Sequence, residues 1–129
     1  MTELHFASAI ELAEKIKLRE ISAVELLDHF LDRVEKFNPV LNAIIWMDVD
    51  GARARARSAD EALANGEDWG PLHGVPMTVK EAFNLAGSPT TWGKPEMQDN
   101  IPKSNSVVVD RFLGAGAIIF GKTNVPIDL

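Results

Sequence analysis

The sequence predicts an α/β fold, in which an N-terminal helical hairpin precedes strands joined by crossover helices. Helical patterns and short β-prone runs follow one another in the order helix, helix, strand, helix, strand, long loop, helix, strand. Strands separated by helices favour a sheet with crossover connections. The 129 residues, 46% of them hydrophobic, are enough for one domain with a core, and no linker or repeat divides them.

Two capping-box patterns predict the helical hairpin. Ser8-Ala-Ile-Glu11 and Ser22-Ala-Val-Glu25 both place a glutamate three positions after a serine, which is typical of a helix start. We expect the first helix to run to about Arg19. We expect the second helix to end at about Phe37, because Pro39 disfavours a helical conformation in the residue before it. The second helix has a stripe of apolar residues spaced by three or four: Val24, Leu27, Leu31 and Val34.

The middle of the chain predicts a strand, a helix and a second strand. Residues 41–47 are a short β-prone run, and the alanines and arginines from about residue 49 to residue 65 favour a helix. The next strand covers residues 75–79. Because side chains alternate along a strand, one face should carry Val75, Met77 and Val79, and the other Thr78 and Lys80.

The last third predicts a long loop, a helix and a buried strand. Residues 85–103 contain several Gly and Pro, and a loop of this length is usually functional or disordered. Asn105 or Ser106 should start a helix that ends near Gly114, and residues 117–120 should form a strand. Residues 116–123 match the phosphate-loop pattern G-x-x-x-x-G-K-[ST], but an extended strand in the middle of that pattern cannot curl its amides around a phosphate.

Composition excludes several classes of protein. The net charge of −6 argues against a nucleic-acid surface, which usually needs a basic patch. The absence of cysteine excludes disulfides and Cys-based zinc sites, and the three histidines show no metal-ligand spacing, so we expect no metal. No apolar run is long enough to span a bilayer, and no signal peptide is visible, so we expect no membrane association and a cytoplasmic location.

Lys80 is the main candidate for chemistry. It ends the run Gly70-Pro-Leu-His-Gly-Val-Pro-Met-Thr-Val-Lys80, in which Pro71 and Pro76 fix the entry to the strand and Gly74 permits close backbone approach. A lysine at a strand end is usually exposed and inert. If it is buried without a carboxylate, its charged form is disfavoured, and the neutral amine can activate a hydroxyl nucleophile. Glu81 should point to the opposite face.

A series of motifs, in order and with familiar spacing, resembles the N-terminal part of the amidase signature enzymes. The resemblance covers nearly the whole chain, so residues 1–129 are interpreted as a single partial domain of that mixed-sheet fold. The motifs are Ser22-Ala-Val-Glu-Leu, Asn38-Pro-Val-Leu-Asn-Ala43, Ala59-Asp60, Gly70 to Lys80 as quoted above, Gly87-Ser-Pro-Thr-Thr-Trp-Gly93, and Gly114-Ala-Gly-Ala-Ile-Ile-Phe-Gly-Lys-Thr-Asn-Val-Pro126.

The resemblance implies hydrolysis of a carboxylic amide by a Ser–Ser–Lys triad, without metal or organic cofactor. The triad lysine matches Lys80, which would deprotonate one serine and through it activate the nucleophilic serine. Ser88, Ser104 and Ser106 do not occupy the family's serine positions, so we expect residues 1–129 alone to be inactive. Two residues depart from the common pattern: Glu81 and Asn105 stand where relatives usually have aspartate.

Two alternatives remain open. The same fold serves as the amidase subunit of a tRNA-dependent amidotransferase, which these residues do not separate from a free-standing amidase acting on a small amide. The chain could instead be a non-catalytic remnant or interaction module. Unpaired strand edges would then favour homo-oligomers, and we expect the isolated chain to be less stable than an ordinary domain of its size, or oligomeric.

Overall fold

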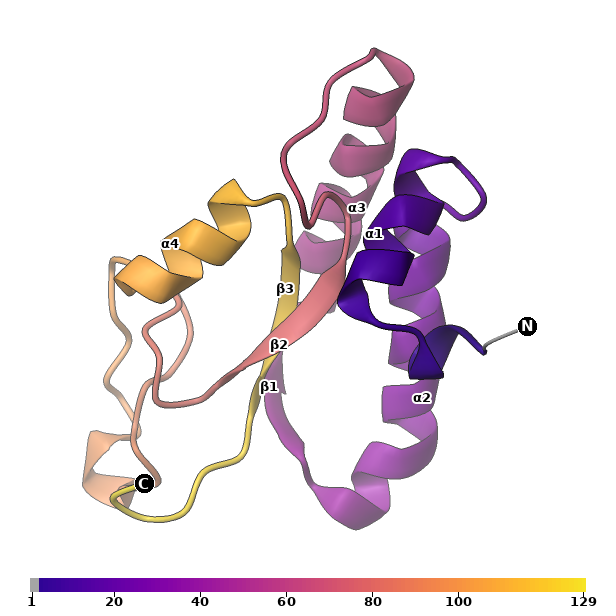
Figure 1. The fold of residues 1–129 in the computed structure, drawn as a ribbon. Helices are drawn as coiled ribbons and strands as arrows, with labels where there is room; N and C mark the ends of the chain where they lie inside the picture. The colour runs from indigo at the N-terminus through magenta and orange to yellow at the C-terminus, as the bar shows by residue number, and fades with distance from the viewer. Residues whose placement is uncertain (1–2) are drawn as a thin grey trace.

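The computed structural model describes residues 3–129 and has the predicted mixed α/β architecture (Figure 1). Two short 3-10 helices, η1 and η2, are added to the predicted elements. The elements in chain order are η1 (Leu4–Phe6), α1 (Ala9–Lys17), α2 (Ala23–Leu41), β1 (Ile44–Met47), α3 (Val49–Ala64), β2 (Pro76–Lys80), η2 (Pro95–Met97), α4 (Val107–Gly114) and β3 (Ile118–Thr123).

The three strands of the described residues form one mixed sheet in the order β1-β3-β2. The central strand, β3, runs antiparallel to β1 and parallel to β2. Helix α4 makes the crossover between the parallel pair, as a parallel connection requires. Figure 1 shows α1, α2 and α3 on one side of the sheet and α4 on the other.

The core is divided by the sheet into two sides. Ile118 and Phe120 of β3 pack with α2 and α3, where small alanines let the helix backbone approach closely. Val79 of β2 and Ile119 of β3 pack with Val109 of α4 on the other side. A further cluster joins α1 to α2 and includes Ile16 and Leu26. Alternate residues of β3 therefore serve opposite faces, as strand geometry demands.

The helix starts agree with the capping-box predictions. Ser8 and Ser22 each accept a hydrogen bond from the backbone of the glutamate three positions later, and each glutamate accepts one in return. Helix α1 ends at Lys17, two residues before the predicted end. Among residues 3–129, no helix is long and apolar enough to cross a lipid bilayer.

The prediction for the end of α2 is wrong. The helix continues through Pro39 to Leu41, and β1 therefore begins only at Ile44. Pro39 has no N–H to donate to Glu35 O, but the helix ends only two residues later, and the Asn42 N–H still donates to Asn38 O at 2.7 Å. Asn38 then fixes the exit of the chain, because its side chain bonds both the N–H and the C=O of Ile44 at 2.9 Å.

The second predicted strand forms where the sequence places it, but its predicted first residue is not part of it. Strand β2 begins at Pro76, and Val75 packs with the α1–α2 cluster instead of sharing a face with Met77 and Val79. Gly74, with φ of +75°, turns the chain just before the strand, and a Cβ there would lie 2.9 Å from Ala23 Cβ. This close approach explains the glycine and separates Val75 from the alternation of β2.

Candidate active site

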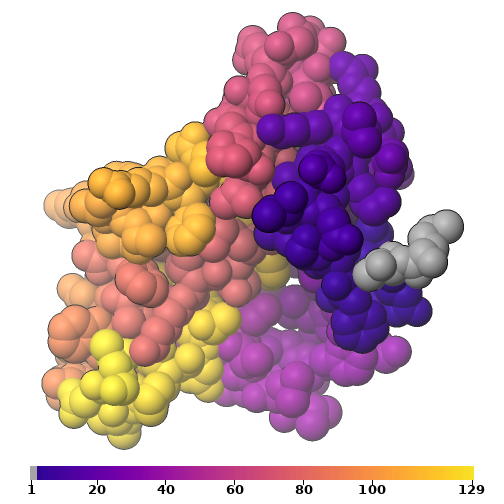
Figure 2. All heavy atoms as spheres, viewed as in Figure 1, coloured from indigo at the N-terminus to yellow at the C-terminus, as the bar shows by residue number. Residues whose placement is uncertain are grey.

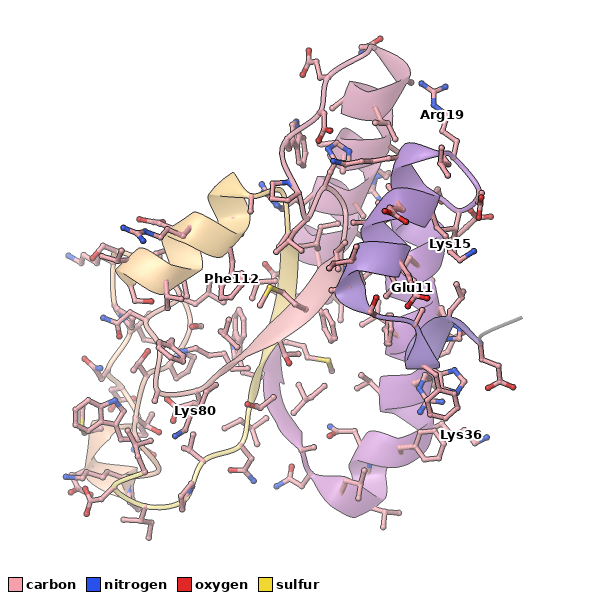
Figure 3. All side chains as sticks on the ribbon, viewed as in Figure 1. Glu11, Lys15, Arg19, Lys36, Lys80 and Phe112 are labelled. Carbon is pink, nitrogen blue, oxygen red and sulfur yellow. The ribbon has the colours of Figure 1, made fainter. Side chains whose placement is uncertain are left out.

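Lys80 is the last residue of β2 and pairs with Thr123 of β3. Its side chain is exposed, and among residues 3–129 no hydrogen bond or ion pair reaches its Nζ. Figure 3 shows Lys80 beyond the end of β2, far from the labelled side chains of α1 and α2. The described residues therefore present the amine at a strand end but do not bury it.

The face that Lys80 shares with Thr78 borders an apolar groove. Thr78, Met77 and Pro76 of β2 line this groove, which has a volume of about 340 Å³ and is closed on its other side by α2. The remaining lining residues are Phe30, Arg33, Val34, Phe37, Asn38, Leu41, Ala43, Ile44 and Phe120. A concave apolar surface beside the strand that ends in Lys80 is the kind of place where a small substrate can bind.

Glu81 lies on the face opposite Lys80, as predicted, and is only 2% exposed. Its carboxylate accepts hydrogen bonds from the backbone N–H of Thr91 and from Thr91 Oγ1, the latter at 3.0 Å. Glu81 is therefore fully engaged with the loop behind the strand. Glutamate reaches this loop without forming an ion pair with the lysine that precedes it.

The segment of residues 85–103, predicted as a long loop, is tied together by its own backbone. Gly87 N donates to Pro102 O and Thr90 N donates to Asn100 O, both at 3.0 Å. The last described residues lie against it, with Lys94 Nζ 2.6 Å from Asp128 Oδ1. In Figure 2 the yellow C-terminal atoms lie beside the orange atoms of the loop.

Ser88, Ser104 and Ser106 lie in different surroundings, and the buried Ser106 Oγ has no hydrogen-bond partner among residues 3–129. Ser88 is fully buried, and its hydroxyl donates to Leu85 O at 2.6 Å. Ser106 is the N-cap residue of α4, and Ser104 is exposed before it. Among residues 3–129, none of these three hydroxyls makes a hydrogen bond with Lys80.

The segment that matches the phosphate-loop pattern does not form such a loop, because Gly121, Lys122 and Thr123 belong to β3. Both ring nitrogens of His73 contact the backbone: its Nδ1 accepts from Trp69 N at 2.9 Å, and its Nε2 lies 2.8 Å from Ala59 O. Within residues 3–129, no cluster of three or more His, Cys, Asp or Glu side chains could hold a metal ion.

Lys122, which sequence reasoning did not single out as a site residue, is completely buried. Its Nζ donates to Pro89 O at 2.6 Å and to Thr90 Oγ1 at 2.9 Å. Burial lowers the pKa of its ammonium group, and the nearby charge of Glu81 partly opposes this effect. The available signal was the apolar run of residues 117–120, which continues as a strand through Lys122 instead of ending before it.

The chain matches amidases over nearly its whole length. An acylamidase from Rhodococcus erythropolis is 42% identical over 128 residues, which cover 98% of this chain and 27% of the relative. A glutamyl-tRNA(Gln) amidotransferase subunit from Acidothermus cellulolyticus is also 42% identical, over 97% of this chain and 25% of the relative. This chain thus spans about a quarter of the length of these relatives.

The fold gives the same result. The structure of a fatty acid amide hydrolase superposes with a TM-score of 0.90 and 31% identity, over 95% of this chain and 22% of that protein. The Amidase family profile matches residues 25–128, which include β2, Lys80 and the loop that follows. The chain therefore belongs to the amidase signature family.

Proposed function

We propose that the protein hydrolyses the C–N bond of a carboxylic amide, and that Lys80 is the proton acceptor of a Ser–Ser–Lys triad. The observation that carries this proposal is the position of Lys80. It is the exposed last residue of its strand, the residues on either side of it in the chain are buried, and it matches the lysine of the family's triad. An amine fixed by the backbone on a rigid strand and free of a carboxylate partner can accept a proton from a hydroxyl.

In this mechanism Lys80 takes the proton of one serine, which in turn deprotonates the nucleophilic serine. The nucleophile attacks the amide carbonyl, the amine or ammonia leaves with a proton, and water releases the acyl group. Backbone amides would stabilise the oxyanion. Because Ser88, Ser104 and Ser106 match neither triad serine, we also propose that residues 1–129 alone do not turn over an amide.

The test measures hydrolysis of simple aliphatic and aryl amides by the protein as its gene encodes it. We expect Lys80→Ala to lower kcat/KM by roughly 10²- to 10⁴-fold, the usual contribution of a general base. Lys103→Ala, at an exposed lysine outside the strand, is the matched control and should retain activity. Activity that survives in Lys80→Ala would exclude the proposed role, and turnover by residues 1–129 alone would exclude the need for further serines.

A second candidate function is that of an amidotransferase subunit, which the likeness to the Acidothermus cellulolyticus protein favours. Such a protein would release ammonia from an amide donor only with its partner subunits. Hydrolysis of free glutamine that rises strongly when partner subunits are added would support this function. Equal hydrolysis of aryl amides with and without partners would support the free-standing amidase.

A further inference from the structure

Lys122 is a buried charged side chain that the proposed mechanism does not use. It lies in the central strand β3, is 0% exposed, and belongs to the largest fully buried residues of the molecule. Lysine is almost never fully buried unless it is paired, because an ammonium group is costly to remove from water. Its presence in the middle of the sheet therefore points to a specific task.

An irregularity in the sheet decides where this side chain points. In the pairing of β2 with β3, Met77 faces Ile119 but Thr78 faces Gly121, so Phe120 is an extra residue on β3. Such a bulge reverses the alternation that follows it, and bulges often re-aim a side chain near a functional site. Lys122 consequently pairs with Val79 and shares its α4-facing side of the sheet.

Glycine is required next to the bulge. A Cβ on Gly121 would lie 2.7 Å from Trp46 O of β1, closer than real contacts of this kind. The bulge thus explains both Gly121 and Lys122. The glycine lets β1 approach the bulge, and the lysine side chain points to the side of the sheet that the reversed alternation gives it. The same residues match the phosphate-loop pattern in the sequence.

The Lys122 ammonium and the Glu81 carboxylate hold three consecutive residues of the loop. Lys122 Nζ bonds Pro89 O and Thr90 Oγ1, and Glu81 bonds the N–H and hydroxyl of Thr91. The two opposite charges come from strand β3 and from the residue that directly follows the neighbouring strand β2. Removing one charge would leave the other buried without compensation, which is more damaging than removing both.

These contacts lie directly behind Lys80. Val79, before it, pairs with Lys122, and Glu81, after it, donates its N–H to Thr123 O at 3.0 Å. We propose that Lys122 is a positioning residue for Lys80: with Glu81 it anchors residues 89–91 behind the end of β2, and so fixes the direction in which the Lys80 amine leaves the sheet. Only the catalytic consequence of this assignment rests on the proposed function.

The test compares Lys122→Met with Lys103→Met in the protein as its gene encodes it. Methionine keeps much of the side-chain volume and removes the charge, whereas Lys103 is an exposed lysine at the end of the same loop. Two readouts are hydrogen exchange at the Thr91 amide and titration of the Lys80 amine followed by carbon-13 NMR. We expect Lys122→Met to speed exchange at Thr91 by roughly tenfold or more and to shift the Lys80 titration. Lys103→Met should change neither.

Two outcomes would overturn the proposal. One is a folded Lys122→Met protein with wild-type exchange at Thr91 and an unshifted Lys80 titration. If Lys122→Met does not fold, the same two readouts are measured on Thr90→Val, which removes one acceptor of the ammonium group. Unchanged exchange at Thr91 and an unchanged Lys80 titration in that variant would then overturn the proposal. Thr90→Ser keeps the hydroxyl and should restore wild-type values. A purely structural role would lower stability without moving the Lys80 titration.

Hydrolysis gives a third readout that separates this proposal from the proposed function. If the protein hydrolyses amides, we expect Lys122→Met to lower kcat by roughly tenfold or more with KM little changed, because a misdirected base affects the chemical step. If the wild-type protein hydrolyses no amide, the proposed function fails. The exchange and titration experiments still decide the role of Lys122 in that case.

Discussion

Asp68 connects the first helix with the turn that leads to strand β2. Its carboxylate lies 2.9 Å from Lys17 Nζ and accepts a hydrogen bond from Gly70 N at 2.9 Å. His73 Nδ1 is also 3.9 Å away, but that nitrogen accepts the Trp69 N–H and is therefore unprotonated, so the contact is not an ion pair. The electrostatic partners of Asp68 are Lys17 and the Gly70 amide.

Asp68 gives the stability of the protein a testable dependence on pH. Its pKa is lowered from the ordinary value of 3.8, first by the hydrogen bond with Lys17 and then by the one from Gly70. Since the folded state binds this proton more weakly than the unfolded chain, the contribution is complete above the ordinary pKa and is lost as the pH falls through the folded pKa.

We therefore expect Asp68→Asn to be less stable than the wild type at about pH 6 and to match it at about pH 2. The difference should stay below about 1 kcal/mol, because the pair is half exposed and screened. Urea unfolding at the two pH values measures it, with the exposed Asp99→Asn as control. An Asp68→Asn deficit that is equal at both pH values would contradict this account.

At the scale of elements, the first turn of α2 shows how the sequence specifies a helix start. Ser22 Oγ accepts from Glu25 N at 3.0 Å, and Glu25 accepts from Ser22 N at 2.9 Å. Asp60 of α3 accepts from Ala23 N and Val24 N, so a neighbouring helix satisfies two further free donors. The capping box could be recognised in the sequence, whereas the contribution of Asp60, 37 residues from Ala23, needed the tertiary structure.

We expect Ser22→Ala to lower the free energy of unfolding by about 1 kcal/mol, since the N-cap acceptor is lost while Asp60 remains. Ser58→Ala, in the exposed middle of α3, is the matched control and should have little effect. Urea denaturation followed by circular dichroism measures both. Equal midpoints for the two variants would mean that the Asp60 contacts alone are sufficient to start α2.

Sequence reasoning placed correctly those elements whose determining residues lie close together in the chain. The helix starts at Ser8 and Ser22 and the strand that carries Lys80 depend on capping residues, alternation and turn residues close in the chain. The predicted end of α2 was wrong because the helix continues through Pro39, and the Asn38 side chain then bonds the backbone of Ile44, an arrangement that the preference of Pro39 alone does not reveal. Lys122 was missed because its direction depends on a bulge at Phe120, which arises only when β3 pairs with β2.

At the scale of the whole molecule, the surface is larger than that of an ordinary monomer. The accessible surface is 7614 Å². A folded monomer of 14.1 kDa usually exposes about 6,700 Å². The excess of roughly 900 Å² is close to one partner's share of a standard protein interface. Part of it lies around the apolar groove, where Phe37 and Leu41 of α2 are 40% and 67% exposed.

The excess surface indicates where residues 1–129 would associate with one another. Strands β1 and β2 are the edges of the sheet, and the groove between α2 and β2 lies beside them. Exposed apolar surface next to unpaired strand edges favours contact with another chain. We propose that residues 1–129, studied alone, self-associate through the groove, because a second copy can cover the surface that this segment leaves exposed.

We expect Leu41→Glu to shift residues 1–129 toward the monomer in sedimentation equilibrium. Leu41 is exposed at the end of α2 and lines the groove, so a carboxylate there would oppose burial by a second copy without disturbing the core. Ile10→Glu is the matched control, because Ile10 is 71% exposed on α1 and does not line the groove. A wild-type segment that is monomeric and melts cooperatively at high temperature would contradict the proposal, since a stable monomer has no need to cover this surface. Equal dissociation by both variants would instead place the contact outside the groove.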